Sequence, residues 1–78
     1  MGKIINEHIK FENGYRVSIQ TSPFHYTSGD GSDAEIAIFN KYGEFVTNQW
    51  KDCRGDDVIG WQSPEDVTSA LVWAASQD

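Results

Sequence analysis

The segment from residue 34 to residue 50 constrains the fold most strongly, because strand-forming residues lie on both sides of a short cluster of turn formers. The apolar residues before the turn are Ile36, Ile38 and Phe39, and those after it are Phe45 and Val46. β-branched and aromatic side chains favour strands, and residues 40–43 between them can reverse the chain. The segment therefore predicts a central β-hairpin.

The register of this hairpin follows if Gly43 takes the left-handed conformation, which glycine adopts without steric cost. A four-residue loop then places Ile38 opposite Phe45 and Ile36 opposite Thr47. We expect this face of the hairpin to lie under a helix. The opposite face should be half exposed, and it carries Ala37, Phe39, Glu44 and Val46.

An N-terminal hairpin is predicted by the positions of its apolar residues. A three-residue loop at 12–14 pairs Phe11 with Tyr15 and Ile9 with Val17, whereas a two-residue Asn-Gly loop would put the two apolar sets on different faces. We therefore predict a type I turn with a bulge at Gly14. The polar residues left on the solvent face are His8, Lys10, Arg16, Ser18 and Gln20.

The segment 22–33 reads as a long loop, because Pro23 cannot donate to a strand ladder and the following Gly, Asp and Ser residues favour turns. Three adjacent aromatic residues, Phe24, His25 and Tyr26, lie within it. Their rings either fold back over the edge of the sheet or form a contact surface for a partner.

A second irregular segment spans residues 48–57, and Val58, Ile59 and Trp61 follow as a short strand. A helix then begins after Ser63, a good N-cap, with Pro64 favoured at its first position. Its apolar stripe is Val67, Ala70, Leu71 and Ala74. The predicted fold is α+β, an antiparallel sheet of about five strands (two hairpins plus a short strand) with one C-terminal helix packed on one face.

Length and composition indicate a single domain over residues 1–78 with a small core. The lone Cys53 cannot form an internal disulfide, and no apolar run approaches the ~20 residues of a membrane span. These features favour a reducing cytoplasm. The formal net charge of −6 repels phosphate, so direct nucleic-acid binding is not expected, whereas a protein with a basic surface would be attracted.

No motif in the sequence indicates catalysis or a cofactor. His8, His25 and Cys53 lack the close ligand pairs of structural zinc sites, and the acidic stretch 30–35 lacks the spacing of a calcium loop. Pairing His25 with Cys53 or with Ser22 would give a nucleophile and a base, but neither lies in a strand-turn-helix elbow. We therefore expect a protein that is not an enzyme and holds no metal.

Carboxylates gather late in the chain, on the loop before the last strand and on the first turn of the helix. They are Asp52, Asp56, Asp57, Glu65 and Asp66. One interpretation is that they only support the helix dipole and solvate the loop. The other is a partner-binding patch with Trp50 or Trp61 as an apolar anchor, suited to an Arg- and Lys-rich groove. The aromatic residues Phe24, His25 and Tyr26 would extend that binding surface.

In its small size, acidity, α+β layout and lack of a catalytic motif, the chain resembles the accessory proteins that bacteriophages encode against host defence, the anti-CRISPR proteins in particular. The resemblance implies an inhibitor, acting in the cytoplasm of a bacterial host cell, that blocks a nucleic-acid-binding defence complex by steric or charge mimicry. Its partner would be a host protein or ribonucleoprotein complex with a basic surface. The alternative is a small regulatory or structural protein that forms a homodimer through its sheet edge.

Overall fold

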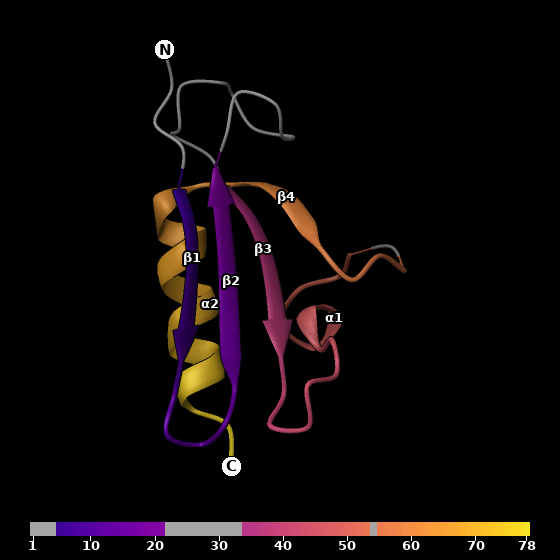
Figure 1. The fold of residues 1–78 in the computed structure, drawn as a ribbon. Helices are drawn as coiled ribbons and strands as arrows, with labels where there is room; N and C mark the ends of the chain where they lie inside the picture. The colour runs from indigo at the N-terminus through magenta and orange to yellow at the C-terminus, as the bar shows by residue number, and fades with distance from the viewer. Residues whose placement is uncertain (1–4, 22–33, 54) are drawn as a thin grey trace.

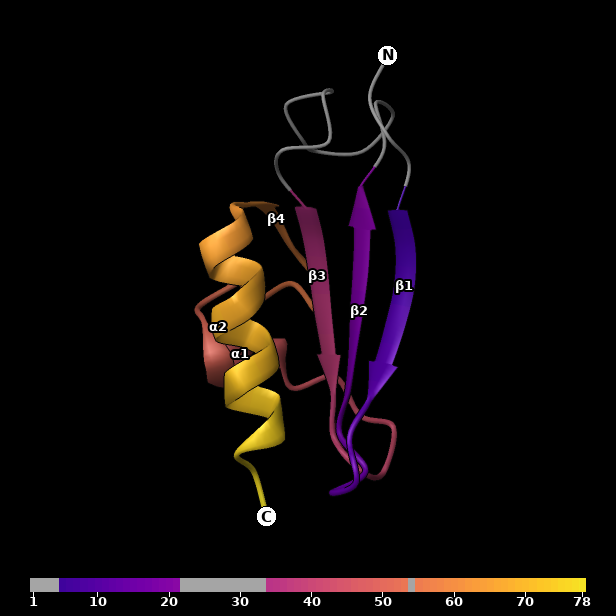
Figure 2. The ribbon, with the colours of Figure 1, turned by 90° about the vertical axis from the view of Figure 1, so that its left-hand side faces the viewer.

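The computed structural model describes residues 5–21, 34–53 and 55–78. Within them the chain forms an α+β fold, a four-stranded antiparallel sheet with the C-terminal helix packed against it (Figure 1). The strands lie in the order β1-β2-β3-β4 and comprise β1 (Ile5–Lys10), β2 (Arg16–Thr21), β3 (Ala34–Phe39) and β4 (Ile59–Gln62). The helices are the short α1 (Thr47–Trp50) and the long α2 (Pro64–Ala75). Figure 2 shows α2 on one side of the sheet, and no helix of the described residues lies on the other side.

The N-terminal hairpin confirms the predicted register. Ile9 pairs with Val17, and the loop closes through the Phe11 N–H, which donates to the Tyr15 carbonyl at 2.8 Å. Gly14 has φ of 89°, as the predicted bulge requires. Ser18, however, is buried and not on an exposed face, because this small side chain lies in an inner strand between its cross-strand neighbours His8 and Ala37.

The predicted central hairpin is wrong beyond its turn. The chain does reverse at residues 40–43, with Gly43 at φ of 81°. Only a single bridge, Phe39 to Phe45, follows before α1 begins at Thr47. The place beside β3 is taken by β4, which pairs Ile36 with Ile59. The described sheet therefore has four strands and not about five.

The residues after the turn also exchange faces relative to the prediction. Because Phe45 lies opposite Phe39 and not Ile38, the register is shifted by one residue, and such a shift turns each side chain to the other face. Phe45 is 47% exposed and packs on Phe39, with their ring centroids 4.5 Å apart. Val46, expected to be half exposed, is buried in the core.

The core lies between the sheet and α2. Val17, Ile36 and Ile38 are fully buried from the strands, and Ala70 and Ala74 are fully buried from the helix. Two alanines at this spacing let the helix approach the sheet closely, as the predicted stripe implies, with Val67 and Leu71 packed at its sides. The predicted helix start is also confirmed, since Ser63 and Asp66 form a reciprocal capping box.

Candidate partner-binding site

The candidate site lies on the face of the sheet opposite α2. Ile36 and Ile38 point into the core, so their neighbours Glu35, Ala37 and Phe39 lie on the other side of β3. At the boundary between β3 and β4 the surface is hollowed over a volume of about 580 Å³. We call this the acidic hollow, and its lining is Glu35, Phe45, Asp56, Asp57, Val58, Gly60 and Trp61.

A β-bulge in β4 places Trp61 at this hollow. Between its two pairing points with β3, β4 runs from Ile59 to Gln62 while β3 runs only from Ala34 to Ile36, so β4 contains one extra residue. Trp61 takes φ of 59°, a left-handed conformation that is rare for a bulky side chain, and the residue is 60% exposed. Strain of this kind is found at functional sites more often than elsewhere.

Helix α1 anchors the acidic loop that follows it. The Thr47 hydroxyl donates to the Asp57 carbonyl at 2.7 Å and accepts from the Ile38 N–H at 2.9 Å, so one buried side chain joins the loop to β3. The Asn48 side-chain amide holds the Asp56 carbonyl at 2.6 Å. These bonds use the main chain of the two aspartates and leave both residues exposed at the hollow.

A neighbouring hollow of about 430 Å³ shares Asp56 and Trp61 with the acidic hollow and is also lined by Asp52 and Cys53. Cys53 is buried, and burial together with the negative charges of Asp52, Asp56 and Asp57 raises the pKa of its thiol. The thiol is therefore held in its neutral form at neutral pH, which is the form that does not act as a nucleophile.

The other residues of the predicted patch lie elsewhere. The Asp66 carboxylate accepts a hydrogen bond from the Ser63 N–H and forms an ion pair with Lys51, whose Nζ lies 3.1 Å away. Both contacts lower the pKa of this carboxyl, and the Ser63 N–H has the larger effect. Glu65 is exposed on the first turn of α2. Trp50 packs against the core, with its indole N–H 3.2 Å from the Ser69 hydroxyl.

The structure thus brings Asp56 and Asp57 to the acidic hollow with Trp61, and Asp52 to its neighbour. It adds Glu35 and Phe45, which the sequence did not single out. Alternation along β3 could have placed Glu35 on the face opposite α2. The position of Phe45 at the hollow could not be predicted, because the register of its hairpin was predicted wrongly. Phe24, His25 and Tyr26 lie outside the described residues.

Residues 5–21, 34–53 and 55–78 contain no group of three or more His, Cys, Asp or Glu side chains placed to hold a metal ion. Across the same parts of the chain, no helix is long and apolar enough to span a membrane.

Comparison with known proteins finds no matching family model, curated protein or solved structure.

Proposed function

We propose that this protein is a small acidic protein-binding module, and that its acidic hollow receives basic side chains of another macromolecule. The observation that carries the proposal is the meeting of three carboxylates, from Glu35, Asp56 and Asp57, with the exposed rings of Phe45 and Trp61. Carboxylates attract a guanidinium or ammonium group, and an aromatic face adds a cation–π attraction of about 0.5–1 kcal/mol at an exposed site. Trp and Arg are also the residues that most often dominate binding energy at interfaces.

The class of partner follows from charge. A surface that presents carboxylates in a protein of net charge −6 suits a protein whose own basic groove binds nucleic acid. We propose that the module occupies such a groove in a host defence complex, as an inhibitor of the anti-CRISPR kind. Occupation of the groove would exclude the nucleic acid both sterically and by charge.

The experiment compares three tagged proteins as baits in a bacterial host lysate, with captured proteins identified by mass spectrometry. The wild type should capture a nucleic-acid-binding protein, and the Asp56→Asn/Asp57→Asn double variant should lose it. The control is Glu12→Gln/Asp78→Asn, which removes the same amount of charge from exposed residues outside the hollow. Equal capture by all three proteins would contradict a role for the acidic hollow.

A second candidate is a homodimer formed through the sheet edge. β1 pairs with β2 alone among the described strands, so its outer edge presents backbone donors and acceptors that a second copy could pair with. Light scattering over a range of protein concentrations separates the two proposals. A dimer that forms without any host component favours the second, and a monomer at all concentrations favours the first.

A further inference from the structure

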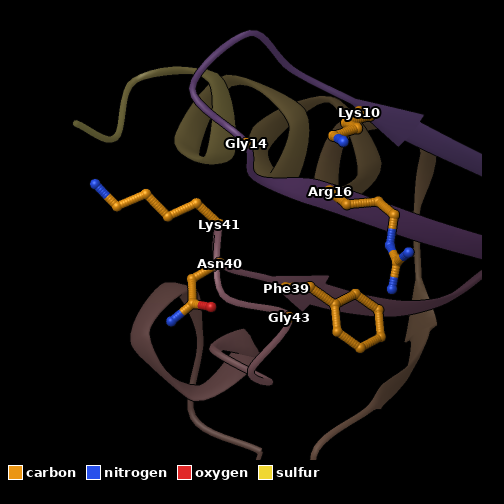
Figure 3. Close-up of a pocket in the computed structure, with 7 residues that line it drawn as sticks. All are labelled: Lys10, Gly14, Arg16, Phe39, Asn40, Lys41 and Gly43. Carbon is orange, nitrogen blue, oxygen red and sulfur yellow. The ribbon is translucent and has the colours of Figure 1, made fainter.

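Three residues form a row across three strands at the turn end of the face opposite α2. Lys10 lies opposite Arg16 in the β1–β2 ladder, and Arg16 lies opposite Phe39 in the β2–β3 ladder. Figure 3 shows the Arg16 guanidinium beside the Phe39 ring, and its central carbon lies 4.4 Å from the ring centroid. Two like charges directly opposite each other destabilise a sheet, so the Lys10–Arg16 pair has an energetic cost.

This row borders a hollow of about 150 Å³, which we call the basic hollow. The turn residues Gly14, Asn40, Lys41 and Gly43 complete its wall. A Cβ on Gly14 would lie 2.6 Å from the Lys41 Cβ, so the glycine allows the two turns to lie in direct contact. The Lys41 side chain extends away from Arg16 in Figure 3, so Lys41 adds positive charge at the rim while Lys10 and Arg16 flank the hollow.

The cations of the basic hollow form no ion pair with a carboxylate of the described residues. They are Lys10, Arg16 and Lys41, three of the six Lys and Arg residues in an acidic protein, and Arg16 and Lys41 each lie over an aromatic ring. Glu44, the acidic residue of the second turn, instead accepts a bond from the Asn40 amide at 2.9 Å. The Arg16 Nε is buried without a hydrogen-bond partner in the same part of the structure.

We propose that the basic hollow binds a phosphate group, with Arg16 and Lys10 as its ligands. A guanidinium presents donors in a planar fork that matches two phosphate oxygens. A phosphate monoester carries about −1.5 to −2 charges at neutral pH, so it would relieve the repulsion between Lys10 and Arg16 better than a single carboxylate. At physiological salt, charges more than roughly 8 Å away are largely screened, so the local cations outweigh the net charge of the protein.

The test is a titration of the full ¹⁵N-labelled chain, followed by amide and Arg16 Nε–H chemical shifts. Sodium phosphate replaces sodium chloride at constant ionic strength, with sodium acetate and phenyl phosphate titrated in parallel. Phosphate should give saturable shifts at Lys10, Arg16 and Phe39, and acetate should bind more weakly. Phenyl phosphate distinguishes the sources, because tighter binding would indicate an aromatic monoester and equal binding would indicate the phosphate group alone.

Variants separate a specific site from general attraction. Arg16→Gln should weaken phosphate binding by about tenfold, from the loss of a charge-assisted bidentate contact. Arg16→Lys keeps the charge but not the fork, and it should recover only part of the affinity. Lys51→Gln, which removes one charge at the far ion pair with Asp66, should bind like wild type. Shifts that never saturate, or equal affinity in Arg16→Gln and wild type with folded spectra in both, would overturn the proposal. The acidic hollow has no residue in this test, so the two proposals can fail independently.

Discussion

Replacing Thr47 with valine tests how the acidic loop is attached to the sheet. The side chain is fully buried, and its hydroxyl both accepts from the Ile38 N–H at 2.9 Å and donates to the Asp57 carbonyl at 2.7 Å. Valine nearly preserves the shape of threonine but can make neither bond. The substitution therefore leaves one buried backbone donor and one backbone acceptor without this partner.

The expected loss can be worked from those two groups. A buried polar group that loses its partner costs about 1–3 kcal/mol, and partial access of water to the Asp57 carbonyl reduces the sum, so we expect a loss of about 2–4 kcal/mol. In a domain of this size each kcal/mol lowers the melting temperature by roughly 4–8 °C. The variant should thus melt roughly 8–30 °C below wild type.

The assay is thermal and urea unfolding followed by circular dichroism, with Thr68→Val as the matched control. Thr68 is exposed on α2, and its hydroxyl donates to the Pro64 carbonyl at 3.1 Å, so the same chemical change there should alter stability by less than about 0.5 kcal/mol. A Thr47→Val protein as stable as wild type, or a Thr68→Val protein destabilised to the same extent, would refute the reasoning.

Three further predictions concern other parts of the molecule. Urea unfolding should show that Gly14→Ala is destabilised more than Gly43→Ala. At both positions an alanine with positive φ carries roughly 1–2 kcal/mol of strain, but only at Gly14 would its Cβ collide with the neighbouring turn. Equal losses of stability would contradict this contact. Asp66→Asn should lower the stability at neutral pH, and the difference in stability from wild type should disappear in acid. The pKa of Asp66 is lowered in the folded protein, so its contribution to stability is present above the ordinary carboxyl pKa and is lost as pH falls through the folded pKa. A difference that persists in strong acid would exclude this charge effect. Iodoacetamide should modify Cys53 slowly in the folded protein at mildly alkaline pH, because burial and then the charge of Asp52 raise the pKa of its thiol. Asp52→Asn should react faster, because it removes the largest of the neighbouring charge effects. Unchanged rates would show that this charge does not act on the thiol.

The parts of the fold that were predicted correctly depend on local signals. In the N-terminal hairpin, apolar residues at odd positions on both sides of Asn13-Gly14 allow one register that keeps Ile9 and Val17 on the same face. At the start of α2, Ser63, Pro64 and Asp66 occupy positions that have a defined chemical role at a helix terminus. Neither prediction needs knowledge of a distant part of the chain.

The central hairpin failed because its outcome depends on distant residues. Thr47 is β-branched and favours a strand, but its hydroxyl bonds the Ile38 N–H that a ladder would otherwise use. The second neighbour of β3 is then β4, whose Ile59 lies far along the chain. No local sequence pattern decides whether the edge of β3 pairs with the segment after its turn or with β4.

In the candidate site, too, some features follow from local sequence and others depend on distant residues. The closeness of the carboxylates along the chain identified Asp56 and Asp57 as part of an acidic cluster, with Trp61 as one of two possible anchors. Their meeting with Glu35 depends on the pairing of β3 with β4 and on the bulge that turns Trp61 outward, and neither is visible in the sequence. The clustering of Lys10 and Arg16 beside Phe39 likewise follows from two ladders at once.

The central claim is that the acidic hollow binds basic side chains, and the most direct measurement follows the Trp61 indole N–H resonance during titration with an arginine-rich peptide. The Trp61 signal should shift saturably, the affinity should fall as salt is raised, and Asp56→Asn/Asp57→Asn should bind markedly more weakly than wild type. The Trp50 signal serves as an internal control, because Trp50 does not line the hollow. A Trp61 resonance that does not move, or peptide affinity that is unchanged in the double variant, would contradict the claim.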